Sequence, residues 1–163
     1  MSTLVNTALS SATANLEEKE KVLTFFIDEQ IYGMEISHVI EIISMQHITE
    51  LPKLPSYIKG VINLRGKIIP VINIRGRFGK EEIDYNEYTS IVTVEVNDMS
   101  VGIIVDMVSE VLSITENDIS KTPEYNSVNS SRYIKYIVRS SDGIKLILDP
   151  AKLLFDDKME AFD

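Results

Sequence analysis

The sequence contains no cysteine and only two histidines, which removes several kinds of site from consideration. Without cysteine the chain forms no disulfide bonds and supplies no thiolate ligands, a composition that suits a reducing compartment. His38 and His47 fall on different expected elements and outside any HExxH motif, so they do not indicate a zinc site. No apolar run approaches the roughly 18 residues of a membrane span, so we expect no membrane insertion.

Motifs of common enzyme classes are also missing. The chain has no GxxxxGK[ST] phosphate-binding loop and no GxSxG nucleophile elbow, and two histidines leave little material for a Ser-His-Asp triad. Asp and Glu are numerous, but the sequence singles out no pair of carboxylates as catalytic. A small hydrolase that uses Asp or Glu stays an alternative, and it requires a deep polar pocket with two facing carboxylates of perturbed pKa.

Negative charge predominates in the chain, but it is unevenly placed. The formal net charge of -9 argues against broad binding to nucleic acids or to anionic membranes. Residues 51–80, which we call the basic segment, contain no acidic residue and seven basic ones: Lys53, Lys59, Arg65, Lys67, Arg75, Arg77 and Lys80. Nucleic-acid binding through this segment is a second alternative and predicts salt-sensitive association with oligonucleotides. The segment offers only Tyr57 and Phe78 as aromatic residues for stacking on bases.

A repeated phrase lies inside the basic segment. Residues 61–67 read VINLRGK and residues 71–77 read VINIRGR. We expect a tight turn at Arg65–Gly66 and a returning strand from Lys67 to Ile74, in which Pro70 marks an edge or a bulge. Arg65 then lies at the apex, exposed to a partner, whereas Arg75 closes the second strand and braces a loop. A guanidinium on a rigid turn suits protein recognition because it makes bidentate contacts and tolerates desolvation better than an ammonium group.

Alternating and β-rich patterns predict about nine or ten short strands. They cover residues 22–27, 31–36, 47–51, 61–64, 67–74, 91–96, 100–106, 109–114, 133–139 and 144–148. Three small helices are expected at residues 38–43, 115–118 and 150–155, with Ser37, Thr115 and Asp149 as their caps. So many short strands joined by tight turns predict a mainly β protein that forms two five-stranded antiparallel β-barrels.

The expected organisation is one folded unit between two polar ends. Residues 1–20 form a flexible leader without the basic region of a secretory signal, and residues 156–163 form an acidic tail. Between them, residues 21–155 form a single domain of two barrel subdomains, about 21–86 and 87–149, followed by the terminal helix 150–155. We expect a cytoplasmic protein.

Five phrases of the sequence carry a family resemblance: YGMEI at 32–36, VxEI at 39–42, IKGVINLRG at 58–66, IPV at 69–71 and VGIIVDxVSEVL at 101–112. Together they resemble the chemotaxis coupling (adaptor) protein family CheW, over residues 22–154. The resemblance implies two SH3-like barrels with a hydrophobic groove between them, no catalytic activity and no cofactor. It also implies a scaffold that joins the cytoplasmic tips of methyl-accepting chemotaxis proteins to the regulatory domain of the histidine kinase CheA, in arrays at the inner face of the cell membrane. The rivals are relatives that carry this domain, CheA itself and CheV, and the length of the chain favours the stand-alone adaptor.

The resemblance also implies a set of functional positions. Glu41 and Arg65 match a charged pair that is important for coupling. The implied coupling positions are Val39, Glu41, Gly60, Asn63, Arg65 and Gly66, the groove positions are Val105 and Val108, and the kinase-facing position is Ile36. Burial tendencies alone predict that both groove valines belong to the core. In one phrase the chain departs from the family, because Asn73 stands where many members have Asp, which puts any ion pair at position 73 in doubt.

Overall fold

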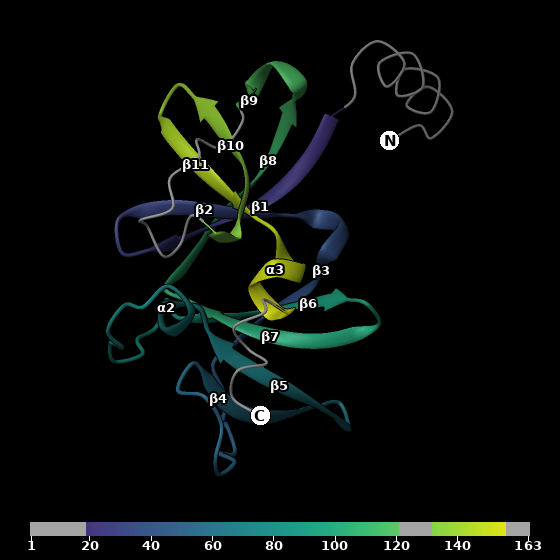
Figure 1. Ribbon diagram of the computed structural model, residues 1–163, viewed down its shortest axis with the longest axis vertical. Coiled ribbons are helices and arrows are strands. Elements are labelled where there is room, and N and C mark those ends of the chain that lie inside the picture. The colour runs from purple at the N-terminus through teal and green to yellow at the C-terminus, as the bar shows by residue number, and fades with distance from the viewer. Residues whose placement is uncertain (1–18, 121–131, 156–163) are drawn as a thin grey trace.

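The structure is a computed structural model that describes residues 19–120 and 132–155. It is mainly β, with two sheets and a few short helices (Figure 1). The predicted acidic tail lies outside the described residues, as does nearly all of the predicted leader. The first strand begins at Lys19, slightly before the boundary that the sequence suggested.

One sheet has six strands in the order β8-β1-β2-β11-β10-β9. Its members are β1 (Lys19–Ile27), β2 (Gln30–Glu35), β8 (Met107–Thr115), β9 (Ile119–Ser120), β10 (Ile134–Ser140) and β11 (Gly143–Leu148). Neighbouring strands are antiparallel except for β2 and β11, which run parallel with Leu146 opposite Tyr32. The sheet therefore combines strands from both ends of the chain.

The other sheet has five strands in the order β3-β6-β7-β5-β4. Its members are β3 (Val39–Ser44), β4 (Ile58–Leu64), β5 (Lys67–Asn73), β6 (Ser90–Val96) and β7 (Met99–Val105). Here β5 and β7 are parallel, with Ile72 opposite Ile103. Pro70 lies in the middle of the sheet rather than on an edge strand, and pairing with β7 begins only at the next residue, where a backbone N–H is available again.

The predicted architecture needs correction in the direction and the number of its strands. Both sheets are mixed rather than purely antiparallel, and one has six strands. The boundary expected near residue 86 does not separate the sheets, because the chain leaves the first sheet after β2, completes the second through β7, and returns at β8. Within the described residues no ladder joins the two edge strands of either sheet, so barrel closure is not seen.

The helix expected at residues 38–43 is also wrong. The chain makes one 3₁₀ turn, η1 (Ile36–His38), and then enters strand β3. Three isoleucines and a valine make this stretch poor in helix propensity, and pairing with β6 decides the outcome. The other two expected helices are confirmed as η2 (Glu116–Asp118), with its capping box, and α3 (Pro150–Phe155). A further helical turn, α2 (Ile74–Arg77), ends the second copy of the repeat.

Apolar side chains from both sheets form one shared core. Phe25 and Met34 of the six-stranded sheet and Val94 and Ile103 of the five-stranded sheet all belong to its largest cluster. Helix α3 lies between the two sheets (Figure 1) and adds Leu153 and Leu154 to the same cluster. Each sheet also has a smaller cluster of its own on strands of that sheet. The two sheets thus depend on each other for burial of their apolar faces.

Gly60 permits a close backbone approach at the start of β4. Thr49 and Val61 exchange two backbone hydrogen bonds of 2.8 and 2.9 Å, which bring the segment before β4 against the strand. A Cβ atom on Gly60 would lie 2.1 Å from the Thr49 carbonyl oxygen, and its φ of +146° is unfavourable for other residues. Gly66 also has a positive φ, +86°, but a Cβ atom there would meet nothing within 4 Å.

We predict that Gly60→Ala lowers the free energy of unfolding by roughly 3–4 kcal/mol, because the added methyl group strains φ and collides with backbone. Gly66→Ala is the matched control and should cost only about 1–2 kcal/mol, for its left-handed backbone alone. Urea denaturation followed by circular dichroism measures both values. Equal losses in the two variants would contradict the close approach.

Candidate functional site

The basic segment does not form a positively charged surface. Most of its charged side chains are paired with carboxylates from elsewhere in the chain or are buried, whereas Lys53 and Lys67 are exposed. Lys59 contacts Glu82 at 2.7 Å and Lys80 contacts Asp28 at 3.1 Å. Arg75 and Arg77 are buried, and Arg65 pairs with Glu41. The stripe of cations that nucleic-acid binding requires is therefore largely neutralised.

Arg65 and Glu41 form a bidentate ion pair on the surface. The two guanidinium nitrogens of Arg65 donate to the two carboxylate oxygens of Glu41 at 2.5 and 2.7 Å. The side chain of Arg65 is 69% exposed and that of Glu41 is 26% exposed, so the pair is open to solvent. The hydrogen bonds that Arg65 donates to Glu41 lower the pKa of the Glu41 carboxyl group and raise the pKa of the Arg65 guanidinium.

The turn that carries Arg65 is built as the repeat predicts. Leu64 pairs with Lys67 across it, and Arg65 and Gly66 have φ values of +53° and +86°, as a two-residue hairpin turn requires. The side chain of Asn63 accepts a hydrogen bond of 2.8 Å from the Gly66 backbone N–H. Asn63 and Gly66 therefore fix the turn, and Arg65 is the residue that the turn presents.

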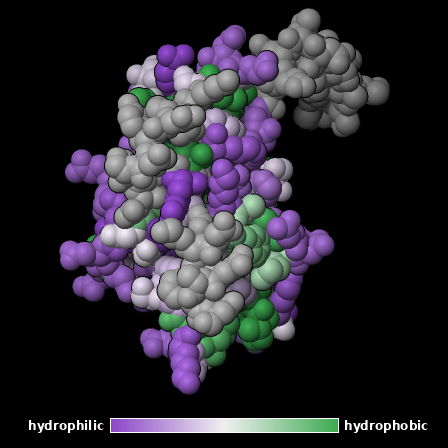
Figure 2. Space-filling view, in the orientation of Figure 1, coloured by the Kyte–Doolittle hydropathy of each residue, from purple (hydrophilic) through white to green (hydrophobic). Residues whose placement is uncertain are grey.

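The ion pair also connects the two edges of the five-stranded sheet. Glu41 lies on β3 at one edge, whereas Arg65 follows β4 at the other edge. The sheet must therefore curl for the two side chains to meet. Ile40 and Ile42 flank Glu41 and are 49% and 45% exposed. On the face seen in Figure 2, hydrophobic residues gather over the part that holds this sheet. Side chains alternate along a strand, so β3 presents Glu41 on one face and these isoleucines on the other. Exposed apolar side chains on an edge strand are typical of a protein-binding surface.

A second charged group, around Arg75, joins the two sheets. A terminal nitrogen of Arg75, on α2, lies 2.8 Å from carboxylate oxygens of both Asp28 and Asp106. Asp28 belongs to the β1–β2 turn of the six-stranded sheet, and Asp106 connects β7 to β8. Arg75 also donates to the Glu81 carbonyl oxygen at 2.8 Å, so it braces a loop as the sequence indicated. The hydrogen bonds from Arg75 and then Lys80 lower the pKa of Asp28.

Asn73, the departure from the family phrase, caps helix α2. Its side-chain oxygen accepts a hydrogen bond of 3.0 Å from the Arg75 backbone N–H. The side chain is buried, and a neutral amide serves as the cap there without placing a charge in the protein interior. The residue therefore has a structural role that needs no ion pair.

Comparison with known proteins identifies the family to which the chain is similar. The family model described as the CheW-like domain matches residues 21–158. The chemotaxis protein CheW of Klebsiella aerogenes is 33% identical, over 88% of this chain and 87% of the relative, and that of Treponema pallidum is 31% identical over the same shares. A crystal structure of the scaffolding protein CheW from Thermoanaerobacter tengcongensis superposes with a TM-score of 0.78 at 34% identity, covering 85% of this chain and 94% of that chain.

The chain belongs to the CheW family. This is a family of chemotaxis scaffolding proteins without catalytic activity, which leaves no basis for the hydrolase alternative. Within residues 19–120 and 132–155, no cluster of three or more potential ligand side chains is arranged to hold a metal ion. The helices of the same residues are all too short or too polar to cross a bilayer.

The positions that CheW membership implies fall into two groups in the structure. Glu41, Asn63, Arg65 and Gly66 meet at the β4–β5 turn and the facing edge of β3. Ile36, Val39 and Val108 are half-buried and pack against the shared core. Val105 is 0% exposed and belongs to that core, so its side chain does not line an open groove. The burial that the tendency of valine predicts is confirmed for Val105.

Sequence reasoning missed the role of Arg77. Its guanidinium carbon lies 4.5 Å from the ring centre of Tyr57 and 4.9 Å from that of Tyr133. Its Nε donates to the Leu153 carbonyl oxygen of α3 at 2.7 Å. These contacts hold the terminal helix against the five-stranded sheet. No local pattern indicates them, because every partner is distant in the sequence.

We predict that Asp28→Asn weakens the junction between the sheets in a pH-dependent way. The folded-state pKa of Asp28 lies below its unfolded value. The Asp28 charge therefore contributes fully to the free energy of unfolding above pH about 4, and this contribution is lost as pH falls through the folded pKa. Because the side chain is nearly half exposed, we expect a loss of about 0.5–1 kcal/mol at pH 7.

Chemical denaturation of both proteins at pH 7 and at pH 3 provides the measurement. The difference in free energy of unfolding between wild type and Asp28→Asn should decrease toward zero at the lower pH. Glu29→Gln is the control, since Glu29 lies in the same turn and its side chain makes no hydrogen bond or ion pair within the described residues. A gap that stays constant between the two pH values would remove the role of the Asp28 charge.

Proposed function

We propose that this chain couples methyl-accepting chemotaxis proteins to the histidine kinase CheA and so controls kinase activity. The observation that carries the proposal is the solvent-exposed Glu41–Arg65 pair on edge strand β3, whose other face exposes Ile40 and Ile42. An edge strand with exposed apolar side chains and an orienting ion pair is suited to bind another folded protein. Membership of a chemotaxis scaffolding family supports chemoreceptors and CheA as the partners.

The implied positions have different roles in this proposal. Glu41 and Arg65 contact a partner directly, whereas Asn63 and Gly66 hold the turn in shape. Val39 and Val108 are half-buried and available at the junction of the sheets, where a receptor helix would lie in an apolar groove. Ile36, the first residue of η1 after β2, faces the kinase's regulatory domain. Gly60 and Val105 act through the backbone and the core, so substitutions there alter binding indirectly.

Each sheet carries a smaller cluster of buried apolar residues of its own, which supports two small barrel-like subdomains. Such a two-part scaffold would hold the receptor at the junction and the kinase at one end. We expect the contact with the receptor and the contact with the kinase each to be of moderate strength alone, and an array of many copies gains stability by multivalency. The signal passes as a bias on the kinase's conformational equilibrium, which requires contacts that differ between its active and inactive states. The site of action would be the cytoplasmic face of the membrane, where receptor tips lie.

We predict that Arg65→Glu lowers kinase activation by about tenfold or more in a reconstituted mixture of receptor fragment, CheA and this protein. The reversal places two carboxylates together and removes the guanidinium that the turn presents. Phosphate transfer from ATP to CheA measures the effect, and circular dichroism checks the fold. Adding Glu41→Arg should restore part of the activity, because the pair is then rebuilt in the opposite sense.

Lys67→Glu is the matched control for this experiment. Lys67 leaves the same turn and undergoes the same change of charge, and among the described residues its ammonium group is bonded only to Ser100, at 3.2 Å. We expect it to retain most of the activation. Full activity of Arg65→Glu, or an equal loss in Lys67→Glu, would show that the pair does not mediate coupling.

A further inference from the structure

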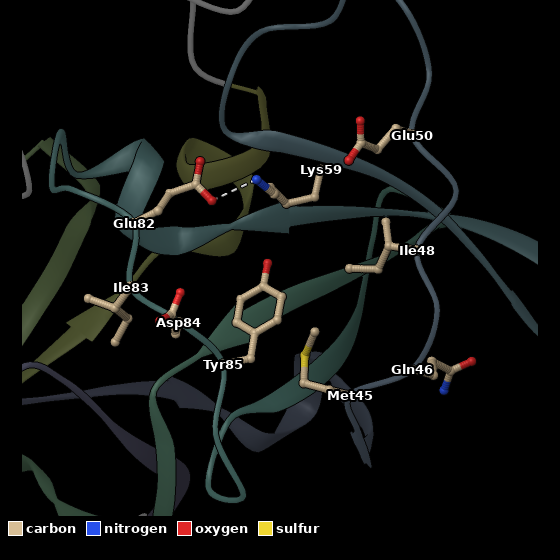
Figure 3. Close-up of a pocket in the computed structure, with 9 residues that line it drawn as sticks. All are labelled: Met45, Gln46, Ile48, Glu50, Lys59, Glu82, Ile83, Asp84 and Tyr85. Atoms are coloured by element: carbon tan, nitrogen blue, oxygen red, sulfur yellow. Dashed lines mark hydrogen bonds and ion pairs between the residues drawn. The ribbon is translucent and has the colours of Figure 1, made fainter.

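A cavity of about 530 Å³ lies beside β4, on the side of the five-stranded sheet where the chain passes from β3 to β4. Its walls come from two segments that are distant in sequence, residues 45–50 and residues 82–85, with Lys59 of β4 between them. Figure 3 shows the ring of Tyr85 in the middle of the cavity, with Met45 and Ile48 to one side and Ile83 and Asp84 to the other. The volume lies in the range of small-ligand and side-chain pockets.

One wall of the cavity is apolar and packs against the core of the five-stranded sheet. Met45 and Ile48 are half-buried and pack against the core cluster of the five-stranded sheet. Tyr85 and Ile83 are 42% and 44% exposed, which is high for such large side chains. Burial still raises the pKa of the Tyr85 hydroxyl, so the ring stays neutral at physiological pH. The cavity therefore offers a flat aromatic face and aliphatic walls to a ligand.

The polar rim of the cavity is negatively charged, because Glu50, Glu82 and Asp84 surround Lys59, its one residue from the basic segment. The Nζ of Lys59 contacts Glu82 at 2.7 Å, and this hydrogen bond is the main cause of the raised pKa of Lys59. Lys59 is thus neutralised by one carboxylate. Glu50 and Asp84 are exposed and make no hydrogen bond or ion pair within the described residues. Two carboxylates are left for a cation from outside.

We propose that this cavity binds an arginine side chain from a basic segment of a partner protein. The planar guanidinium stacks on an aromatic ring and makes bidentate contacts to carboxylates, which matches Tyr85 with Glu50 and Asp84. The aliphatic stem of arginine fits against Met45 and Ile48. A lysine ammonium is more strongly hydrated and has no flat face to stack, and an anionic ligand is repelled by the rim.

This inference stands apart from the Glu41–Arg65 surface. None of the nine residues that line the cavity belongs to that pair or to its turn. Partner binding at the cavity is therefore separable by mutation from receptor and kinase coupling.

The test uses the full chain, labelled with ¹⁵N, and three small probes. The first is N-acetyl-arginine N-methylamide, which represents an arginine within a peptide. N-acetyl-citrulline N-methylamide has nearly the same shape without the charge, and free arginine represents a metabolite. We expect saturable shifts at the amides of Ile48, Glu50, Asp84 and Tyr85 with the first probe. Citrulline should bind at least about tenfold more weakly, since it lacks the charge-assisted hydrogen bonds.

A variant with Glu50→Gln and Asp84→Asn tests the charge complementarity. It should weaken binding of the capped arginine by about tenfold or more. The control, Glu29→Gln with Asp98→Asn, removes the same number of negative charges elsewhere on the surface and should change affinity less than about twofold. Tyr85→Leu keeps apolar bulk but removes the ring, and we expect a loss of about threefold to fivefold.

Several results would overturn the proposal. Equal affinity for the citrulline probe, unchanged affinity in the Glu50→Gln/Asp84→Asn variant, or shifts that map to another part of the surface would each exclude arginine recognition at the cavity. Tighter binding of free arginine than of the capped form would identify a metabolite site instead of a site for a protein segment.

Discussion

Apolar side chains from both sheets pack into one shared core, and their burial holds the two sheets at fixed positions relative to each other. The exposed features depend on this arrangement. Strand β3 pairs with β6, which contributes Val92 and Val94 to the same core, and this pairing holds Glu41 at the edge of the sheet. Val108 and Ile36 lie at the junction because they pack on that core from the six-stranded sheet and its neighbouring turn. Around the margin of the core, Arg75 ties Asp28 to Asp106 with charge-assisted hydrogen bonds.

Electrostatic pairing explains why the most basic stretch of the sequence is not a basic surface. Glu41, Glu82 and Asp28 are supplied by parts of the chain outside the basic segment, and each meets one or two of its cations. The remaining arginine, Arg77, is buried between aromatic rings. What reaches the surface is a balanced ion pair at one place and an acidic cavity at another. Both features suit recognition of other proteins, and neither offers the row of unpaired cations that a phosphate backbone attracts.

Several residues within the phrases shared with the family determine the local backbone conformation. Gly60 allows the Thr49 carbonyl to approach β4, Asn73 caps α2, and Asn63 and Gly66 shape the turn below Arg65. Substitution at such positions changes where a functional side chain lies rather than removing a contact with a partner. Arg65 differs from them, because its guanidinium extends into solvent from a turn that the other residues hold.

The sequence by itself determined the β-rich class, the Arg65–Gly66 hairpin, the capped turns at residues 116–118 and 150–155, and, through the family phrases, the identity of the charged pair. These features depend on neighbours within a few residues, such as alternation of apolar side chains, turn glycines and capping oxygens. Only the tertiary structure decided that residues 39–44 form a strand, that the sheets are mixed and interleaved along the chain, and that the basic segment is largely neutralised. Each of these outcomes depends on a partner that is distant in the sequence. The packing of the two sheets around their shared apolar core determines which distant strand or carboxylate each segment contacts.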